Sequence, residues 1–122
     1  MDLLEILLIS STVLMLPVIM VIFGWVFRTH PPKDINWVYG YRTKRSVSSQ
    51  EAWDFAHAHI GKVWTYAGAV MLLASAVSLL FLLNTEGYDY WIAGMLLLFA
   101  EMGIMVGTIP LTESALKKEL GV

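Results

Sequence analysis

The chain has 122 residues, of which 57% are hydrophobic and only 15% are charged, and its formal net charge is −2. A soluble domain carries about 25% charged residues, so this composition excludes an ordinary soluble protein and indicates an apolar surrounding. Because the chain contains no cysteine, disulfide bonds and thiolate chemistry are excluded as well.

Three long stretches hold almost none of the charge: residues 3–27 with only Glu5, residues 63–83 with none, and residues 91–111 with only Glu101. A helix needs about 20 mostly apolar residues to cross a hydrocarbon core of roughly 30 Å. Backbone polar groups inside lipid must be paired within their own segment, which requires helices. The sequence therefore predicts an all-α integral membrane protein with three transmembrane helices, forming a single membrane domain over residues 1–122.

The first connection covers residues 28–62, and Pro31 and Pro32 are expected to end the first helix. Residues 34–43 show no helical period and predict an ordered, irregular segment that lies against the membrane surface. Ser48 and Glu51 then have the spacing of a capping box, so we expect an amphipathic helix that begins there. This helix meets no strong stop before residue 83, so it is expected either to stand alone or to continue into the second span.

The second connection, residues 84–90, is short and predicts an antiparallel hairpin of spans two and three. The tail, residues 112–122, follows Pro110 and has helical spacing of its apolar residues.

The positive charges lie on one side of this arrangement. Six of the eight Lys and Arg residues fall in the connection 28–62, and the other two, Lys117 and Lys118, are in the tail. The N-terminus and the second connection carry only acidic charges. The positive-inside rule therefore predicts a multi-pass cell-membrane protein with its N-terminus outside and its long loop and C-terminus in the cytoplasm.

Glu101 is expected near the middle of the bilayer, where a charge costs at least ~2.5–3.5 kcal/mol on insertion scales. On a helix it shares one face with Gly94, Thr108 and Thr112, and that face is expected to point toward the other spans. Two interpretations remain open: Glu101 is a titrating functional group, or it is a protonated acid that bonds to Ser75 or Ser78.

Gly103 and Gly107 form a GxxxG pattern on a different face of the third span, which suits close helix packing or a homo-oligomer. His57 and His59 are two residues apart and lie on nearly opposite helix faces, so they do not predict a metal site and are interpreted as headgroup-level histidines. No catalytic set, phosphate loop or dinucleotide motif is present, and we expect no enzyme and no cofactor. The basic loop is better explained by anionic lipid of the bilayer than by nucleic acid.

One run of residues resembles the signature of the SdpI family, bacterial membrane proteins named for immunity to a secreted sporulation-delaying toxin peptide. The run consists of Asn36, Gly40, Tyr41, Arg42, Thr43, Ser46, Ser49, Trp53, Ala56, His57 and Gly61. The resemblance extends over about residues 28–118. It implies a role in toxin-peptide immunity together with membrane sequestration of a transcriptional repressor, with a toxin peptide or a repressor as partner.

Two functional hypotheses follow. The first is a non-enzymatic membrane protein of immunity or signalling type, which binds its partner at the Gly-Tyr-Arg-Thr loop, residues 40–43. There Arg42 either clamps a partner or pairs with Glu51 or Asp54 and pins the loop. The second is a small oligomeric transporter or ion-coupled carrier that uses Glu101.

Overall fold

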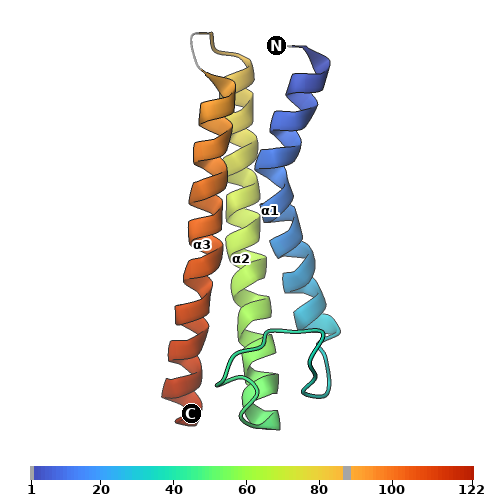
Figure 1. Ribbon diagram of the computed structural model, residues 1–122, viewed down its shortest axis with the longest axis vertical. Helices are drawn as coiled ribbons and strands as arrows, with labels where there is room; N and C mark the ends of the chain where they lie inside the picture. Colours follow the sequence, from blue (N-terminus) through green and yellow to red (C-terminus); the bar gives the residue numbers. More distant parts are fainter. Residues whose placement is uncertain (1, 87–88) are drawn as a thin grey trace.

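The computed structural model describes residues 2–86 and 89–122, and all regular structure within them is helical. The three helices α1 (Leu3–Thr29), α2 (Gln50–Leu83) and α3 (Tyr90–Leu120) lie side by side (Figure 1). The N-terminus and the α2–α3 connection lie at one end, the hairpin end. The α1–α2 connection and the C-terminus lie at the other, the loop end. Residues 87 and 88 of the predicted hairpin turn lie outside the described residues.

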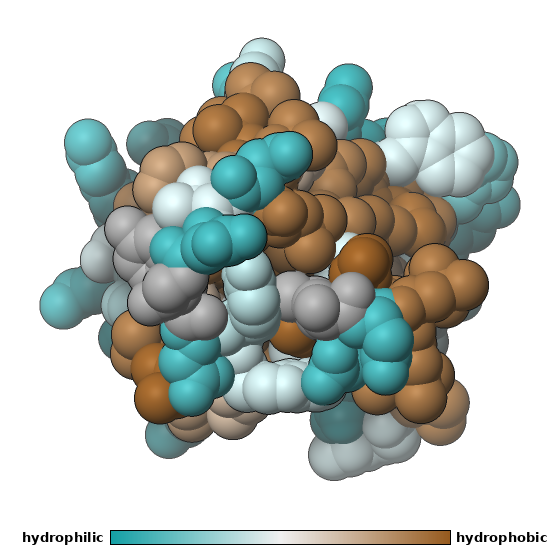
Figure 2. Space-filling model, turned by 90° about the horizontal axis from the view of Figure 1, so that it is seen from above, coloured by the Kyte–Doolittle hydropathy of each residue, from teal (hydrophilic) through white to brown (hydrophobic). Residues whose placement is uncertain are grey.

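Each helix is long and apolar enough to cross a membrane. Many large hydrophobic side chains point outward from all three helices, which suits a lipid surrounding. Seen from the hairpin end, hydrophobic residues cover wide areas of the visible surface between the hydrophilic side chains (Figure 2). The predicted all-α architecture with three transmembrane helices is thus confirmed.

The start of α2 corrects one prediction. Ser49, and not Ser48, caps this helix: the Ser49 hydroxyl accepts the Ala52 N–H at 3.0 Å. The Ser48 hydroxyl instead donates to the Arg45 carbonyl at 2.6 Å. Ser48 still belongs to the turn that precedes the helix, so its spacing to Glu51 does not produce the predicted capping box.

The predicted loop helix is the first part of α2, because α2 runs without a break from Gln50 to Leu83. Its 34 residues extend about 51 Å at 1.5 Å per residue, well beyond a hydrocarbon core of roughly 30 Å. The residues before the apolar span 63–83 therefore project past that core. Likewise, α3 continues through Pro110, so most of the tail is helical.

Glycines bring α1 and α2 together. A Cβ atom on Gly24 would lie only 2.6 Å from the Thr65 backbone nitrogen, and one on Gly61 would lie 3.1 Å from the Gly24 carbonyl oxygen. Further along, a Cβ on Gly68 would meet Val21 at about the same spacing, 2.9 Å. Small residues permit such close backbone approach, which is how helices associate in lipid.

Polar side chains connect α2 to α3. Ser75 donates to the Glu101 carboxyl at 2.7 Å, and the Trp64 indole donates to the Thr108 hydroxyl at 2.9 Å. His59 Nδ1 lies 3.1 Å from the Thr112 hydroxyl oxygen. Glu101, Thr108 and Thr112 are all buried, as is Gly94, so the predicted inward face of the third span is confirmed.

Candidate functional site

The connection between α1 and α2 docks against α2 at residues 39–43. Gly40 adopts φ +121°, a conformation that L side chains rarely adopt. A Cβ atom there would lie 2.7 Å from His57 Nε2 and 2.9 Å from the Trp53 ring. Only glycine therefore fits at this position, both for its backbone angle and for its contact with α2.

His57 holds the next residue of the segment. The Tyr41 N–H donates to His57 Nε2 at 2.8 Å, and His57 Nδ1 lies 2.7 Å from the Trp53 carbonyl oxygen. These two bonds require a neutral ring with its proton on Nδ1. The ring is fully buried between Trp53 and an edge-on Phe27. His57 precedes the apolar span 63–83, and burial lowers its pKa, which favours the same neutral form.

The Tyr41 side chain reaches across to α3. Its hydroxyl donates to the Glu113 carboxylate at 2.7 Å, and Arg45 forms an ion pair with the other Glu113 oxygen at 3.4 Å. Burial and the adjacent carboxylate raise the pKa of Tyr41 above its usual range, so its hydroxyl remains a donor. Burial alone would raise the pKa of Glu113, but its hydrogen-bond donors and Arg45 outweigh burial and lower it. The segment 39–43 thus bridges α2 and α3.

Local turns give the segment its shape. Asn36 Oδ1 accepts the N–H groups of Val38 and Tyr39, at 3.0 and 2.7 Å, which forms an Asx turn. The buried Ser46 hydroxyl accepts the Thr43 N–H at 2.8 Å and donates to the Tyr41 carbonyl at 2.9 Å. The Thr43 hydroxyl in turn accepts the Ser46 N–H at 3.1 Å. Short-range bonds of this kind confirm that the segment predicted from residues 34–43 is ordered.

Arg42 does not make either of its predicted ion pairs. Within the described part of the chain, its guanidinium pairs with neither Glu51 nor Asp54. Its Nη1 donates to the Trp37 carbonyl at 3.1 Å, and its Cζ lies 4.6 Å from the centre of the Trp37 ring. The five-residue separation of Arg42 and Trp37 makes this local pairing more accessible than a reach to α2.

The other residues of the sequence motif serve different parts of the structure. Trp53 is buried beneath Gly40, and its indole donates to the Pro32 carbonyl at 2.8 Å. Ser49 caps α2, as described above. Gly61 lies away from the segment 39–43, at the contact between α2 and α1, where an added Cβ would meet Arg28.

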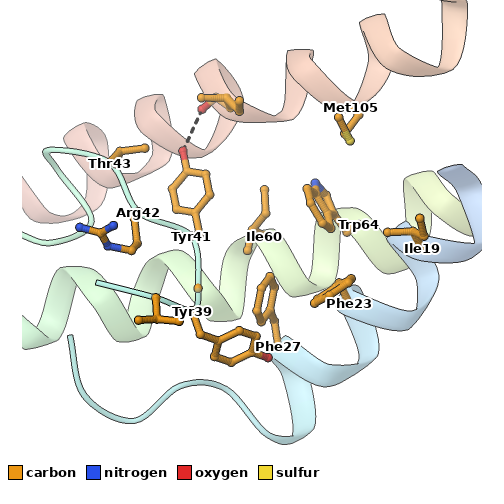
Figure 3. Close-up of a pocket in the computed structure, with 13 residues that line it drawn as sticks. Ile19, Phe23, Phe27, Tyr39, Tyr41, Arg42, Thr43, Ile60, Trp64 and Met105 are labelled. Carbon is orange, nitrogen blue, oxygen red and sulfur yellow. Dashed lines mark hydrogen bonds between the residues drawn. The ribbon is translucent and has the colours of Figure 1, made fainter. Parts of the chain in front are cut away.

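A pocket of about 480 Å³ lies beside the segment 39–43. α2 contributes Ile60 and Trp64, while α1 and α3 contribute one wall each (Figure 3). Its apolar lining residues are Ile19, Phe23, Phe27, Val38, Ile60, Trp64, Met105 and Ile109, and the segment 39–43 closes one end. The polar residues Arg42 and Thr43 belong to that end, so the pocket is apolar in its depth and has polar residues at its rim. The Arg42 guanidinium itself points away from the apolar lining (Figure 3) and toward Trp37.

Glu101 lies apart from this pocket. It is 4% exposed, its Oε1 accepts the bond from Ser75, and its Oε2 has no hydrogen-bond partner among the described residues. The predicted bond to Ser75 is therefore present, while Ser78 bonds to the Ala74 carbonyl instead. The structure thus separates the predicted residues into a loop site and a buried acid within the membrane span.

Sequence reasoning did not assign His57 and Glu113 to the site. The interpretation of His57 as a headgroup-level histidine did not anticipate that its ring is buried and bonded on both nitrogens. The spacing of Trp53, His57 and Ile60 on one helical face could have indicated this burial. No local sequence pattern pairs Glu113 with the loop. The described residues contain no group of three or more His, Asp or Glu side chains suited to hold a metal ion.

Comparisons with known proteins bear on the same residues. Residues 33–112 match the sequence model of the SdpI/YfhL protein family, a range that includes the segment 39–43, His57 and Glu101 and ends one residue before Glu113. The chain is also 36% identical, over 99 residues, to the protein described as "Uncharacterized protein YfhL" of Bacillus subtilis (strain 168). That alignment covers 81% of this chain and 80% of the relative. No solved structure matches the chain.

Proposed function

Because the chain belongs to the SdpI/YfhL protein family, we propose that it is a non-enzymatic immunity protein that binds a membrane-active toxin peptide at its loop site. Family membership suggests the immunity type, and three apolar helices suit a multi-pass membrane protein. A transcriptional repressor that the protein recruits to the membrane is the second partner that the resemblance implies.

One observation carries the choice of the loop site. The segment 39–43 is fixed to α2 through His57 and to α3 through Glu113, and it borders an apolar pocket with a polar rim. An amphipathic peptide at the membrane surface offers apolar side chains for such a pocket and polar groups for such a rim. The arrangement is rigid enough for recognition, because short-range turns and long-range bonds hold the same five residues.

Survival of toxin-treated cells tests this proposal. Cells sensitive to a secreted sporulation-delaying toxin peptide should survive when they express the protein. Gly40→Ala should abolish protection, because the added Cβ collides with His57 and displaces the segment 39–43. Gly121→Ala is the matched control, since Gly121 also has a positive φ of 67° but open space around it. Equal protection by both variants, or none by the wild type at normal membrane levels, would contradict the proposal.

A carrier function is the second candidate, and the unpartnered Oε2 of buried Glu101 favours it. Buried ionisable groups in membrane spans often mark proton or ion paths. Glu101→Gln keeps the acceptor for Ser75 but cannot titrate. The test uses vesicles that enclose a pH-sensitive dye and carry an imposed proton or ion gradient. If the protein is a carrier, the wild type should change the pH of the lumen, and Glu101→Gln should not. If wild type moves protons or ions and Glu101→Gln does not, the binding function is not the main one.

We further propose that the loop end faces the cytoplasm and the hairpin end faces outward. The loop and the C-terminus lie at one end of the bundle, together with the cations of the chain (Figure 1). A cysteine placed after residue 122 should resist a membrane-impermeant thiol reagent in intact cells, whereas one placed before residue 2 should react. The native chain has no cysteine, so the label is specific. Labelling at the C-terminus of intact cells would refute this orientation.

A further inference from the structure

The pocket beside the segment 39–43 is open, and its walls belong to the membrane spans. Ile19 and Phe23 of α1 and Met105 of α3 lie within the apolar stretches 3–27 and 91–111. No water is available at such depth, and the described chain contributes no further side chain to fill the space. An apolar pocket between transmembrane helices is therefore filled by whatever the bilayer supplies.

The rim of the pocket carries one cation. Arg42 lines it, whereas Lys44 and Arg45 follow in the sequence without lining the pocket, and Arg45 is paired with Glu113. The residues 28–62 together carry six cations and three acids, whereas the hairpin end carries acids only. A basic rim at the membrane surface complements the phosphate of an anionic lipid, and basic pockets between transmembrane helices commonly bind such headgroups.

The side chains around Arg42 suit a headgroup-level position. Trp37 and Val38 are 86% and 94% exposed, which is unusual for apolar residues unless lipid or a partner covers them. Indole rings favour the headgroup level of a bilayer. Arg42 stacks on Trp37 and donates one bond to its carbonyl, and a guanidinium has five N–H donors, so donors remain for a phosphate.

We propose that this pocket is a binding site for an anionic phospholipid, with one acyl chain between α1 and α3 and the phosphate at Arg42. The apolar depth of the pocket binds the acyl chain, and Arg42 at its rim binds the negatively charged phosphate. The site therefore discriminates phosphatidylglycerol from phosphatidylcholine, which has the same chains but no net charge. This inference does not depend on toxin binding. It assigns the ligand that the pocket holds in the absence of toxin, and a toxin peptide that enters the pocket would displace that lipid.

Native mass spectrometry of the full chain in detergent, titrated with phosphatidylglycerol or phosphatidylcholine, tests the charge preference. Wild type should bind one phosphatidylglycerol about five- to tenfold more tightly than phosphatidylcholine. Arg42→Gln should remove most of that preference. Lys118→Gln is the matched control, because it removes the same charge at the same end from an exposed residue outside the pocket. Equal binding of the two lipids by wild type would overturn the proposal.

A second pair of variants tests whether the acyl chain of the lipid lies in the pocket. Ile109→Phe narrows the pocket from α3 and should weaken binding of both lipids several-fold, while Ile104→Phe should leave it unchanged. Both positions are exposed, at 43% and 48%, but only Ile109 lines the pocket. Ile19→Phe repeats the test from α1, and helix content by circular dichroism shows that each variant is folded.

Three results would overturn the inference. The first is equal lipid binding by Ile109→Phe and Ile104→Phe. The second is a hydrophobic helical peptide that binds wild type but not Ile109→Phe, with no lipid adduct. The third is a two-chain species without lipid that Ile109→Phe dissociates, which would make the pocket an interface between copies of this chain.

Discussion

The two contacts that α2 makes are built by different means. Toward α1, glycines allow the backbones to approach until an added Cβ on Gly24 would collide with the Thr65 nitrogen. Toward α3, the buried polar residues Glu101, Thr108 and Thr112 each meet a polar group of α2. The first contact depends on shape and the second on hydrogen bonds, although both serve helices in the same lipid.

This difference explains where the function-related residues occur. A shape-dependent contact carries no group that binds or titrates, and it tolerates little change. A hydrogen-bonded contact holds polar groups that can exchange partners. Glu113 directly follows Thr112 on α3, about 100° around the helix, and holds Tyr41. It therefore joins the loop site to the α2–α3 contact.

The largest expected effect breaks the glycine contact. Gly24→Leu should destabilise the protein by about 3 kcal/mol or more, because its side chain collides with backbone atoms that cannot move aside. Thermal melting in detergent, followed by helical circular dichroism, measures the loss. Gly103→Leu is the control, since nothing lies within 4 Å of a Cβ there. Equal melting of the two variants would contradict the role of shape.

A smaller effect is expected in the polar contact. Glu101→Leu removes the acceptor of the buried Ser75 hydroxyl and should cost about 0.6–1.7 kcal/mol, the range of such bonds in lipid. Glu101→Gln keeps an acceptor and should cost less. Melting of both variants in the same detergent compares them. The difference in stability between Glu101→Leu and Glu101→Gln should shrink when Ser75 is also replaced by alanine. If that difference stays the same, the assignment of Ser75 as the partner is wrong.

The bond between Tyr41 and His57 should weaken in acid. The pKa of His57 is lowered in the folded protein, so docking stabilises the neutral ring. This contribution is complete above the ordinary histidine pKa of about 6.5 and decreases as the pH falls below it. Hydrogen exchange of the Tyr41 amide should therefore be faster at pH 5 than at pH 7.5, after correction for intrinsic rates.

His57→Gln provides the control for this pH effect. Glutamine can accept the Tyr41 N–H but does not titrate, so the pH dependence of exchange should largely disappear. His59, whose pKa is also lowered by burial and by Lys62, contacts Thr112 and remains in this variant. A pH dependence that persists unchanged in His57→Gln would assign the effect to His59 or to another group.

The last expected effect is local and concerns the contact of the loop with α3. Tyr41→Phe removes the hydroxyl that donates to Glu113 and should cost about 1 kcal/mol, since Arg45 still pairs with the carboxylate. Limited proteolysis of the segment 39–43 should become modestly faster. Tyr66→Phe, at an exposed tyrosine outside the loop site, should have no effect. Identical cleavage of Tyr41→Phe and wild type would show that Glu113 does not hold the loop.

The sequence by itself determined the three spans and the inward face of α3. Both depend on local patterns: runs of about 20 apolar residues require a membrane helix, and residues seven apart share a face of it. These features follow from the sequence because lipid leaves the backbone only one way to satisfy its hydrogen bonds. The sequence left Ser75 or Ser78 as the partner of Glu101, and the structure selects Ser75.

Only the tertiary structure decided the partners within the loop site. Tyr41 finds His57 at a separation of 16 residues and Glu113 at a separation of 72, and no local pattern encodes either distance. The cap at Ser49, the pairing of Arg42 with Trp37 and the pocket also depend on how an irregular segment returns to two helices. An irregular segment has no fixed period, so its contacts are set by the surfaces that receive it. Here those surfaces are the buried face of α2 around His57 and the part of α3 around Glu113.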